Sequence, residues 1–277
     1  MKTKIVSEIG INHNGDINIA KQMIDIAATA GIPYVKFQKR NPDLCVPEAQ
    51  KTKMRDTPWG YITYLEYKKK IEFEEKEYDE IDNHCYNRIE WFSSPWDVDS
   101  AYFLCENYPD IPYIKLASAC ITDTDLLEVV KQYGIPVIMS TGMSNKKEVD
   151  NCINFLGDQV EYILACNSTY PTKDVDMNLK FIQTLKFEYP MYRIGFSNHS
   201  PGIQHILSSV VLGAEMVEFH QTLDRSMYGT DQGASIETPG VFKIVKMIKA
   251  IEVGMGNGEW IVTKEEEEMK KKLRRVL

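Results

Sequence analysis

Short apolar segments and amphipathic segments alternate along the whole chain. Eight runs rich in Val, Ile, Tyr and Phe are hydrophobic almost without interruption, which is typical of strands covered on both faces. These runs lie at 4–9, 34–38, 90–94, 113–117, 136–141, 160–166, 192–196 and 216–220. The segments between them show the apolar spacing of a helix, and several end at a glycine, as 19–30 does at Gly31. The alternation predicts a parallel sheet with a helix after each strand.

Eight strand–helix units in a chain of 277 residues favour a closed α/β fold, the TIM (β/α)8 barrel, which usually takes about 250 residues. The alternative is an open doubly wound sheet, but no Gly-x-Gly-x-x-Gly loop follows the first run. One connection is unusually long, an excursion between strands 2 and 3 with a loop at 40–63 and a charged helix at 64–86. Loops of this length are typical of lids, so we expect 40–60 to fold over the barrel mouth. We expect one domain over 1–262 and a charged C-terminal helix within 263–277.

Composition and charge narrow the possible functions. The net charge is −8, which does not favour nucleic acid or an anionic membrane as a partner. No apolar run reaches the roughly 18 residues that span a bilayer, and no signal peptide is visible at the N-terminus. The six cysteines include no Cys-x-x-Cys pair, so we expect reduced thiols in a cytoplasmic protein.

Polar residues end every one of the eight runs, where a barrel places its active site. They are Glu8, Lys36, Gln38, Ser93, Ser94, Lys115, Ser118, Ser140, Thr141, Asn167, Ser168, Ser197, Asn198, His199 and His220. Serine and threonine are common where a strand leads into a turn. Two lysines, a glutamate and two histidines converging on one mouth are less readily explained by turns, so they indicate a functional site.

Lys36 and Lys115 lie within apolar strands, where an unpaired charge is costly. One interpretation is a structural ion pair with Glu8. We favour the other, in which two lysines on different strands bind a phosphate or a carboxylate. A Schiff-base lysine is a third possibility, because burial lowers the pKa of a lysine.

His199 and His220 end neighbouring strands. They are either a hydrogen-bonded pair in the core or two ligands of a divalent cation, completed by Asp231, Glu8 or water. His13 lies in an Asn-His-Asn-Gly sequence that favours a tight turn. The aromatic residues of the excursion favour packing, although Trp59 in an exposed turn could cover a ligand.

A set of ordered motifs covering about 5–258 resembles the sialic acid synthase family, which includes N-acetylneuraminate, legionaminate and pseudaminate synthases. The motifs are EIGINHNG at 8–15, VKFQ at 35–38, TPWG at 57–60, YLEY at 64–67, YIKLAS at 113–118, STGM at 140–143, STYP at 168–171, GFSNH at 195–199 and EFH at 218–220. The resemblance covers the catalytic barrel only, and we expect the chain to be without the family's C-terminal antifreeze-like domain.

The resemblance implies a transferase that condenses phosphoenolpyruvate with an N-acylated amino sugar, using Mn2+ or Mg2+. It implies phosphoenolpyruvate-binding residues at Lys36, Ser94, Lys115, Ser118, Ser168 and Ser197. It implies metal ligands at His199 and His220, and it places Glu8, Tyr170 and Asp231 near the reacting centre or the sugar.

We therefore predict a barrel that makes a sialic (nonulosonic) acid and phosphate from phosphoenolpyruvate and an acceptor such as N-acetylmannosamine, and that forms a homo-oligomer. The first alternative is a legionaminate-type synthase acting on a diamino-dideoxy sugar. The second is a barrel that binds a sugar acid without turnover. Release of phosphate from phosphoenolpyruvate distinguishes the second alternative from the other two.

Overall fold

Eight parallel strands pair in chain order, and the last pairs with the first. They are β1 (Lys4–Gly10), β2 (Tyr34–Lys39), β5 (Glu90–Pro95), β6 (Ile114–Leu116), β7 (Val137–Ser140), β8 (Val160–Cys166), β9 (Arg193–Asn198) and β10 (Met216–Thr222). This computed structural model describes residues 2–276. The closed sheet confirms the TIM barrel, and each predicted strand overlaps an observed one. The chain forms these strands because their residues are buried on both faces, as in β7, where all four residues are buried.

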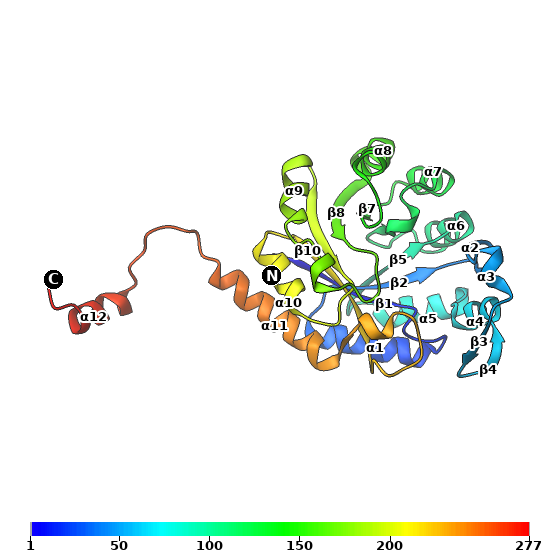
Figure 1. The fold of residues 1–277 in the computed structure, drawn as a ribbon, viewed down its shortest axis with the longest axis horizontal. Coiled ribbons are helices and arrows are strands. Elements are labelled where there is room, and N and C mark those ends of the chain that lie inside the picture. The colour runs from blue at the N-terminus through cyan, green and yellow to red at the C-terminus, as the bar shows by residue number, and fades with distance from the viewer. Residues whose placement is uncertain (1, 277) are drawn as a thin grey trace.

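A helix follows each strand and covers the outside of the barrel (Figure 1). These helices are α1 (Ile17–Ala30), α5 (Glu75–Cys85), α6 (Val98–Asn107), α7 (Thr124–Tyr133), α8 (Lys146–Leu156), α9 (Phe181–Glu188), α10 (Gln204–Val211) and α11 (Thr238–Gly254). α1 begins where Asp16 accepts a hydrogen bond from the backbone of Asn18, and it ends at Gly31, whose φ of 82° favours glycine. Short 3-10 helices lie at Ser118–Cys120, Gly157–Gln159, Asp174–Asp176 and Gln232–Ala234, and the short strand β11 (Ile236–Glu237) pairs with β10.

The excursion between β2 and β5 differs from its prediction. The expected loop at 40–63 contains the one-turn helices α2 (Pro42–Cys45) and α3 (Glu48–Lys51) and an antiparallel hairpin of β3 (Met54–Thr57) and β4 (Gly60–Thr63). The expected helix at 64–86 is two helices, α4 (Tyr64–Ile71) and α5. The break follows from tertiary contacts. Phe73 is buried, Lys39 Nζ donates to its carbonyl at 2.6 Å, and Glu72 accepts from the backbone N–H of Arg40 at 2.9 Å.

Near the C-terminus, α12 (Lys264–Leu273) forms within the segment predicted to be a charged helix. Thr263 and Glu266 cap each other's backbone at its start. None of its residues is buried, and Figure 1 shows it beyond the end of α11, away from the barrel. Within 2–276, no helix has the length and apolar character needed to cross a membrane. All six cysteines lie in this range, and none of them is in a disulfide.

Candidate functional site

A cavity of about 80 Å³ opens at the C-terminal ends of the barrel strands. Ten of the eleven predicted site residues line it, namely Glu8, Lys36, Ser94, Lys115, Ser118, Ser168, Tyr170, Ser197, His199 and His220. The eleventh, Asp231, lines a cavity next to it. Closure of the barrel brings these residues together, because residues more than 200 positions apart, such as Glu8 and His220, are direct neighbours in the β1–β10 ladder.

Four charged side chains meet at the floor of this cavity. Lys36 Nζ lies 3.3 Å from Glu8 Oε2 and 3.4 Å from Glu218 Oε1. Lys115 Nζ lies 3.7 Å from the same oxygen of Glu218 and donates to Ser140 Oγ at 2.7 Å. All four charged residues are buried. The ion pair between Lys36 and Glu8 considered from the sequence is present, but it is part of a larger cluster that faces the cavity.

The two carboxyl groups of the cluster differ in pKa. Burial raises the pKa of Glu8 to about 7, against the opposing attraction of Lys36. Burial alone would also raise the pKa of Glu218, but the attraction of Lys115 and Lys36 outweighs it, and the pKa of Glu218 is lowered. At neutral pH Glu218 is therefore ionised, whereas Glu8 is present in both protonation states.

The two lysines differ in the same way. Burial lowers the pKa of Lys115. At Lys36 burial acts in the same direction, but Glu218 and Glu8 outweigh it, so that the pKa of Lys36 is raised. The site therefore stabilises the charge on Lys36, whereas Glu218 offsets the charge on Lys115 only in part. A cation in this state is suited to bind an anionic ligand.

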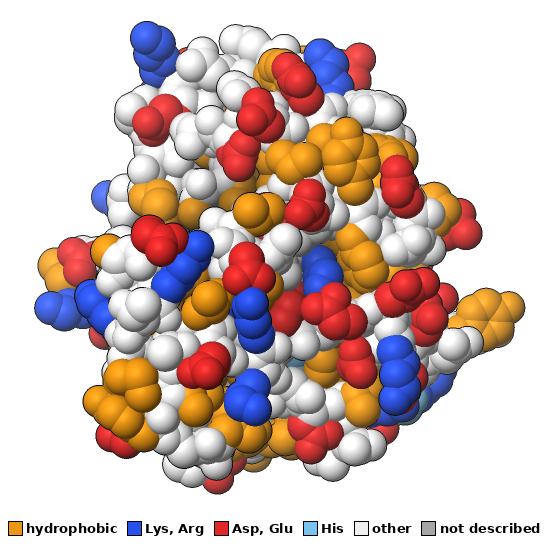
Figure 2. Space-filling model, turned by 90° about the vertical axis from the view of Figure 1, so that its right-hand side faces the viewer, with side chains coloured by type: hydrophobic (Ala, Val, Ile, Leu, Met, Phe, Trp, Pro, Cys, Tyr) orange, Lys and Arg blue, Asp and Glu red, His pale blue; other side chains and the backbone are white. Residues whose placement is uncertain are grey.

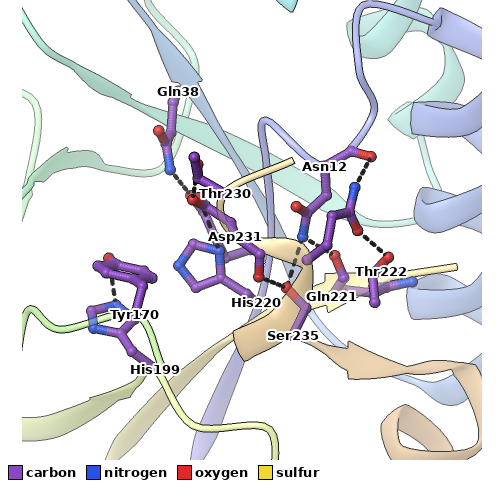
Figure 3. A network of polar contacts seen from close by, with 12 residues as sticks. Asn12, Gln38, Tyr170, His199, His220, Gln221, Thr222, Thr230, Asp231 and Ser235 are labelled. Atoms are coloured by element: carbon purple, nitrogen blue, oxygen red, sulfur yellow. Dashed lines mark hydrogen bonds and ion pairs between the residues drawn. The ribbon is translucent and has the colours of Figure 1, made fainter. Parts of the chain in front are cut away.

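His199, His220 and Tyr170 form a second cluster that lines the same cavity (Figure 3). The two imidazole centroids are 5.3 Å apart. The Tyr170 ring stacks on His199 at 4.1 Å, and its hydroxyl is 2.8 Å from His199 Nε2. His199 Nδ1 donates to the carbonyl of Asn167 at 2.6 Å, so in the neutral ring Nε2 carries the lone pair, which accepts the hydrogen bond of the Tyr170 hydroxyl.

Asp231 lies beside His220, with its Oδ2 3.7 Å from His220 Nδ1. A hydrogen-bonded chain holds its loop in place, because Ser235 Oγ donates to the carbonyl of Asp231 at 2.7 Å and accepts from Asn12 Nδ2 at 2.8 Å (Figure 3). This chain fixes the carboxylate against the imidazole although the two residues come from different segments.

Two observations bear on whether these residues fit a divalent cation. His220 Nδ1 is buried without a hydrogen-bond partner, and burial lowers the pKa of His220 to about 4, so its ring is neutral and can act as a ligand. Among residues 2–276, however, no group of three or more His, Cys, Asp or Glu side chains has metal-binding spacing. The two histidines thus offer at most a partial donor set, whose remaining positions would be filled by other groups, water or substrate.

Comparison with known proteins identifies the family, since residues 23–260 match the NeuB family. The chain belongs to the NeuB family. It is 34% identical to N,N'-diacetyllegionaminic acid synthase of Campylobacter jejuni, over 93% of this chain and 78% of that protein. It is 31% identical to human N-acetylneuraminate-9-phosphate synthase, over 91% of this chain and 71% of that protein. A solved N-acetylneuraminic acid synthetase from Leptospira borgpetersenii superposes with a TM-score of 0.85 at 32% identity, covering 100% of this chain and 94% of that one.

One glycine of this NeuB-family chain allows a close approach at the cavity. A Cβ at Gly142 would lie 2.2 Å from Ser168 Oγ and 2.8 Å from Ser118 Oγ. No side chain fits there, so the two serine hydroxyls pack directly against the backbone that follows β7. The arrangement places backbone and hydroxyl groups on the same wall of the cavity, where they can hold an anion.

Glu218 had no predicted role, although it belongs to one of the motifs on which the resemblance was based. Its carboxylate contacts both lysines and accepts from Ser197 Oγ at 3.0 Å, so it is the central acid of the charged cluster. The signal was present, because Glu218 precedes His220 by two residues on one strand and therefore lies on the same face. A carboxylate inside an apolar strand also requires a partner.

The excursion of the NeuB-family barrel contributes to a second cavity, of about 260 Å³, which adjoins the first and shares Gln38, Trp96 and Tyr170 with it. Its wall includes the segment from Arg40 to Pro47 and several residues of α4. The first part of the excursion therefore lies at the mouth, as expected. Trp59 lines neither cavity and packs on Tyr67 at 6.2 Å between ring centroids, so its expected position over a ligand is not observed.

Proposed function

We propose that this chain condenses phosphoenolpyruvate with an N-acylated amino sugar to give a nonulosonic acid and phosphate. The observation that carries the proposal is the charged cluster, in which Lys36 and Lys115 face a small cavity at the catalytic end of the barrel. The family supports it, because the relatives described above are named as synthases of such acids.

The lysines suit the two anionic groups of phosphoenolpyruvate. Lys115 has an incompletely neutralised charge, and a phosphate or carboxylate would supply the missing counter-ion. Lys36 is already paired with two carboxylates, so it can bind a further anion only together with the other members of the charged cluster. Hydroxyl donors from Ser94, Ser118 and Ser168 line the same cavity and would complete the hydrogen bonds of the anion.

The reaction forms one carbon–carbon bond and breaks one carbon–oxygen bond. The enol carbon of phosphoenolpyruvate attacks the aldehyde carbon of the sugar, and the aldehyde oxygen takes up a proton. Water then adds to the carbon that carries the phosphate, and phosphate leaves with its bridging oxygen. A carboxyl group with a pKa near 7 is suited to accept the proton of that water, and Glu8 is such a group.

We propose that His199, His220 and Asp231 hold the divalent cation, Mn2+ or Mg2+. When bound there, the cation would polarise the aldehyde oxygen as a Lewis acid. The neutral ring of His220 and the lone pair on Nε2 of His199 support this assignment. Tyr170, whose hydroxyl contacts that nitrogen, would orient the sugar once it releases His199.

The acceptor in this proposal is N-acetylmannosamine or a close relative. A diamino-dideoxy sugar is the second candidate, because the Campylobacter jejuni relative is named as a diacetyllegionaminic acid synthase. Side chains that distinguish the two sugars would have to lie on the acceptor side, around Gln38, Tyr170 and Asp231.

The test is release of inorganic phosphate from phosphoenolpyruvate by the purified chain with Mn2+ and a panel of acceptors. We expect release only when an N-acylated amino sugar is present, with a product whose mass equals acceptor plus pyruvate. Lys131→Met serves as a control variant and should release phosphate like the wild type, because Lys131 lies on α7 outside both cavities. Sugar binding without phosphate release from any acceptor would instead favour the non-catalytic barrel.

A further inference from the structure

The second cavity contains two cations that have no ion-pair partner. Arg40 and Lys68 both line it. Among residues 2–276, no carboxylate oxygen lies within 4 Å of the Arg40 guanidinium or of Lys68 Nζ. The nearby Glu72 does not serve this purpose, because it contacts Lys39 Nζ at 3.5 Å and the backbone N–H of Arg40 at 2.9 Å.

Arg40 is held in position but not neutralised. Its guanidinium lies 4.0 Å over the Trp96 ring, and Nη2 donates to Gln38 Oε1. Nη1 is buried and has no hydrogen-bond acceptor. A buried donor without an acceptor is destabilising, and more so when the group is charged, so such an atom calls for an explanation.

A second orphaned donor lies at the same place. Trp96 Nε1 is buried without a partner, and Trp96 lines both cavities. Lys68 adds a third donor group. Burial and the repulsion of Arg40 lower the pKa of Lys68 to about 8, as expected for a cation without a counter-ion. Three N–H donor groups therefore surround a cavity and lack an acceptor with several lone pairs.

The position of these donors relative to the reacting centre restricts what the ligand can be. The second cavity joins the first through Gln38, Trp96 and Tyr170, and it extends away from Lys36 and Lys115 toward α4. The only carboxylate on its wall besides Glu72 is Asp231, within the described chain, and Asp231 faces His220. A group bound by Arg40 and Lys68 would therefore belong to the acceptor and not to phosphoenolpyruvate.

We propose that Arg40 and Lys68 bind a phosphate carried by the acceptor sugar, so that the preferred acceptor is an N-acylated amino sugar phosphate. This inference rests on the proposed function and specifies its acceptor. Phosphoenolpyruvate adds three carbons at the aldehyde end, so carbon 6 of a hexosamine acceptor becomes carbon 9 of the product. A phosphate on carbon 6 lies at the end of the sugar opposite to the aldehyde. The second cavity likewise lies beyond the reacting centre, so it is placed to receive this phosphate when the aldehyde is at that centre.

Other features of this side of the molecule agree with a small, specific anion site. Figure 2 shows the side of the molecule that bears α2, α3, α4 and the β3–β4 hairpin, and its basic side chains are interspersed with acidic ones. The surface therefore has no broad basic patch that would attract a polyanion.

The experiment compares kcat/KM for N-acetylmannosamine and for its 6-phosphate in the wild-type chain and in four variants. We expect the wild type to prefer the phosphorylated acceptor by about tenfold or more. Arg40→Met and Lys68→Met should each reduce this preference about tenfold. Lys69→Met is the matched control and should keep the preference, because Lys69 is the next residue on α4 but pairs with Asp43 at 2.8 Å outside this cavity. Arg40→Lys, which keeps the charge, should retain part of the preference and guards against a folding defect in Arg40→Met.

Equal kcat/KM for the two acceptors in the wild type, or an unchanged preference in both Arg40→Met and Lys68→Met, would overturn the inference while leaving the proposed function intact. If neither acceptor releases phosphate, the proposed function fails, and calorimetric titration still decides the inference. Tighter binding of the 6-phosphate than of the free sugar, lost in Arg40→Met, would support it. Equal binding of the two sugars, or binding of inorganic phosphate that matches the 6-phosphate, would refute it.

Discussion

Replacing each lysine of the charged cluster with methionine should separate ligand binding from stability. In Lys115→Met, Glu218 keeps its contacts with Lys36 at 3.4 Å and Ser197 at 3.0 Å. The variant loses the ion pair with Glu218 at 3.7 Å and the hydrogen bond to Ser140, but it also loses a buried cation whose lowered pKa shows that its charge is disfavoured. These effects oppose each other, so the free energy of unfolding should change by only about 1 kcal/mol.

Lys36→Met should be far more destabilising. Glu8 and Glu218 both lose their nearest cation, and Glu8 keeps only the Gln38 amide at 2.5 Å. Leaving a buried charge without its partner costs about 3–5 kcal/mol. The raised pKa of Lys36 agrees with this larger loss, because the fold stabilises its protonated form.

The affinity for phosphoenolpyruvate should fall strongly in Lys115→Met, although the stability of this variant changes little. Loss of a charge-assisted contact costs about 1.5–3 kcal/mol, which corresponds to an affinity for phosphoenolpyruvate about 10- to 150-fold weaker in Lys115→Met. Urea denaturation gives the unfolding free energies, and calorimetric titration with phosphoenolpyruvate gives the affinities. Undiminished affinity in Lys115→Met, or a larger loss of stability in Lys115→Met than in Lys36→Met, would refute the reasoning.

Three further predictions concern the metal, the acid–base group and a buried histidine. Chelation should abolish turnover, and Mn2+ should restore it. His220→Ala should lose Mn2+ binding with little change in melting temperature. Full activity in excess chelator would contradict the metal assignment. If the carboxylate form of Glu8 accepts the proton of water, kcat/KM should rise with pH through about 7, and Glu8→Gln should lack this rise. A rise that persists in Glu8→Gln would exclude Glu8 as the group responsible. Burial lowers the pKa of His13 to about 3, below its unfolded value near 6.5, so its contribution to stability is complete above that value and is lost as the pH falls toward 3. Urea denaturation between pH 4 and 7 should show a slope reduced by up to about 1.4 kcal/mol per pH unit in His13→Gln, and an unchanged slope would contradict the assignment.

The barrel was predictable from the sequence because burial on both faces leaves a clear mark on each strand. All eight apolar runs became strands, and α7 and α8 begin and end where the periodicity and caps indicate. The break between α4 and α5 was not predictable, since no proline or glycine stands between Glu72 and Glu74. Contacts of Lys39 and Arg40 with that segment produce the break, and such tertiary contacts leave no local signal.

The location of the candidate site was also predictable, because strand ends of a closed barrel converge whatever the loops do. The prediction was incomplete where it considered only the last residues of a strand, and Glu218, two positions earlier on the same face, was left without a role. Arg40 and Trp96 lie just beyond strand ends, where the loop path decides what each side chain contacts. Their pairing at 4.0 Å therefore required the structure.

The central claim is that the chain joins phosphoenolpyruvate to a sugar with cleavage of the carbon–oxygen bond. The most direct measurement uses phosphoenolpyruvate labelled with 18O at its bridging oxygen, an N-acylated amino sugar or its 6-phosphate, and Mn2+, followed by mass spectrometry of both products. The account predicts that the label is found in inorganic phosphate and that the organic product has the mass of acceptor plus pyruvate. Label retained in the organic product, or phosphate released without a sugar-acid product, would contradict it.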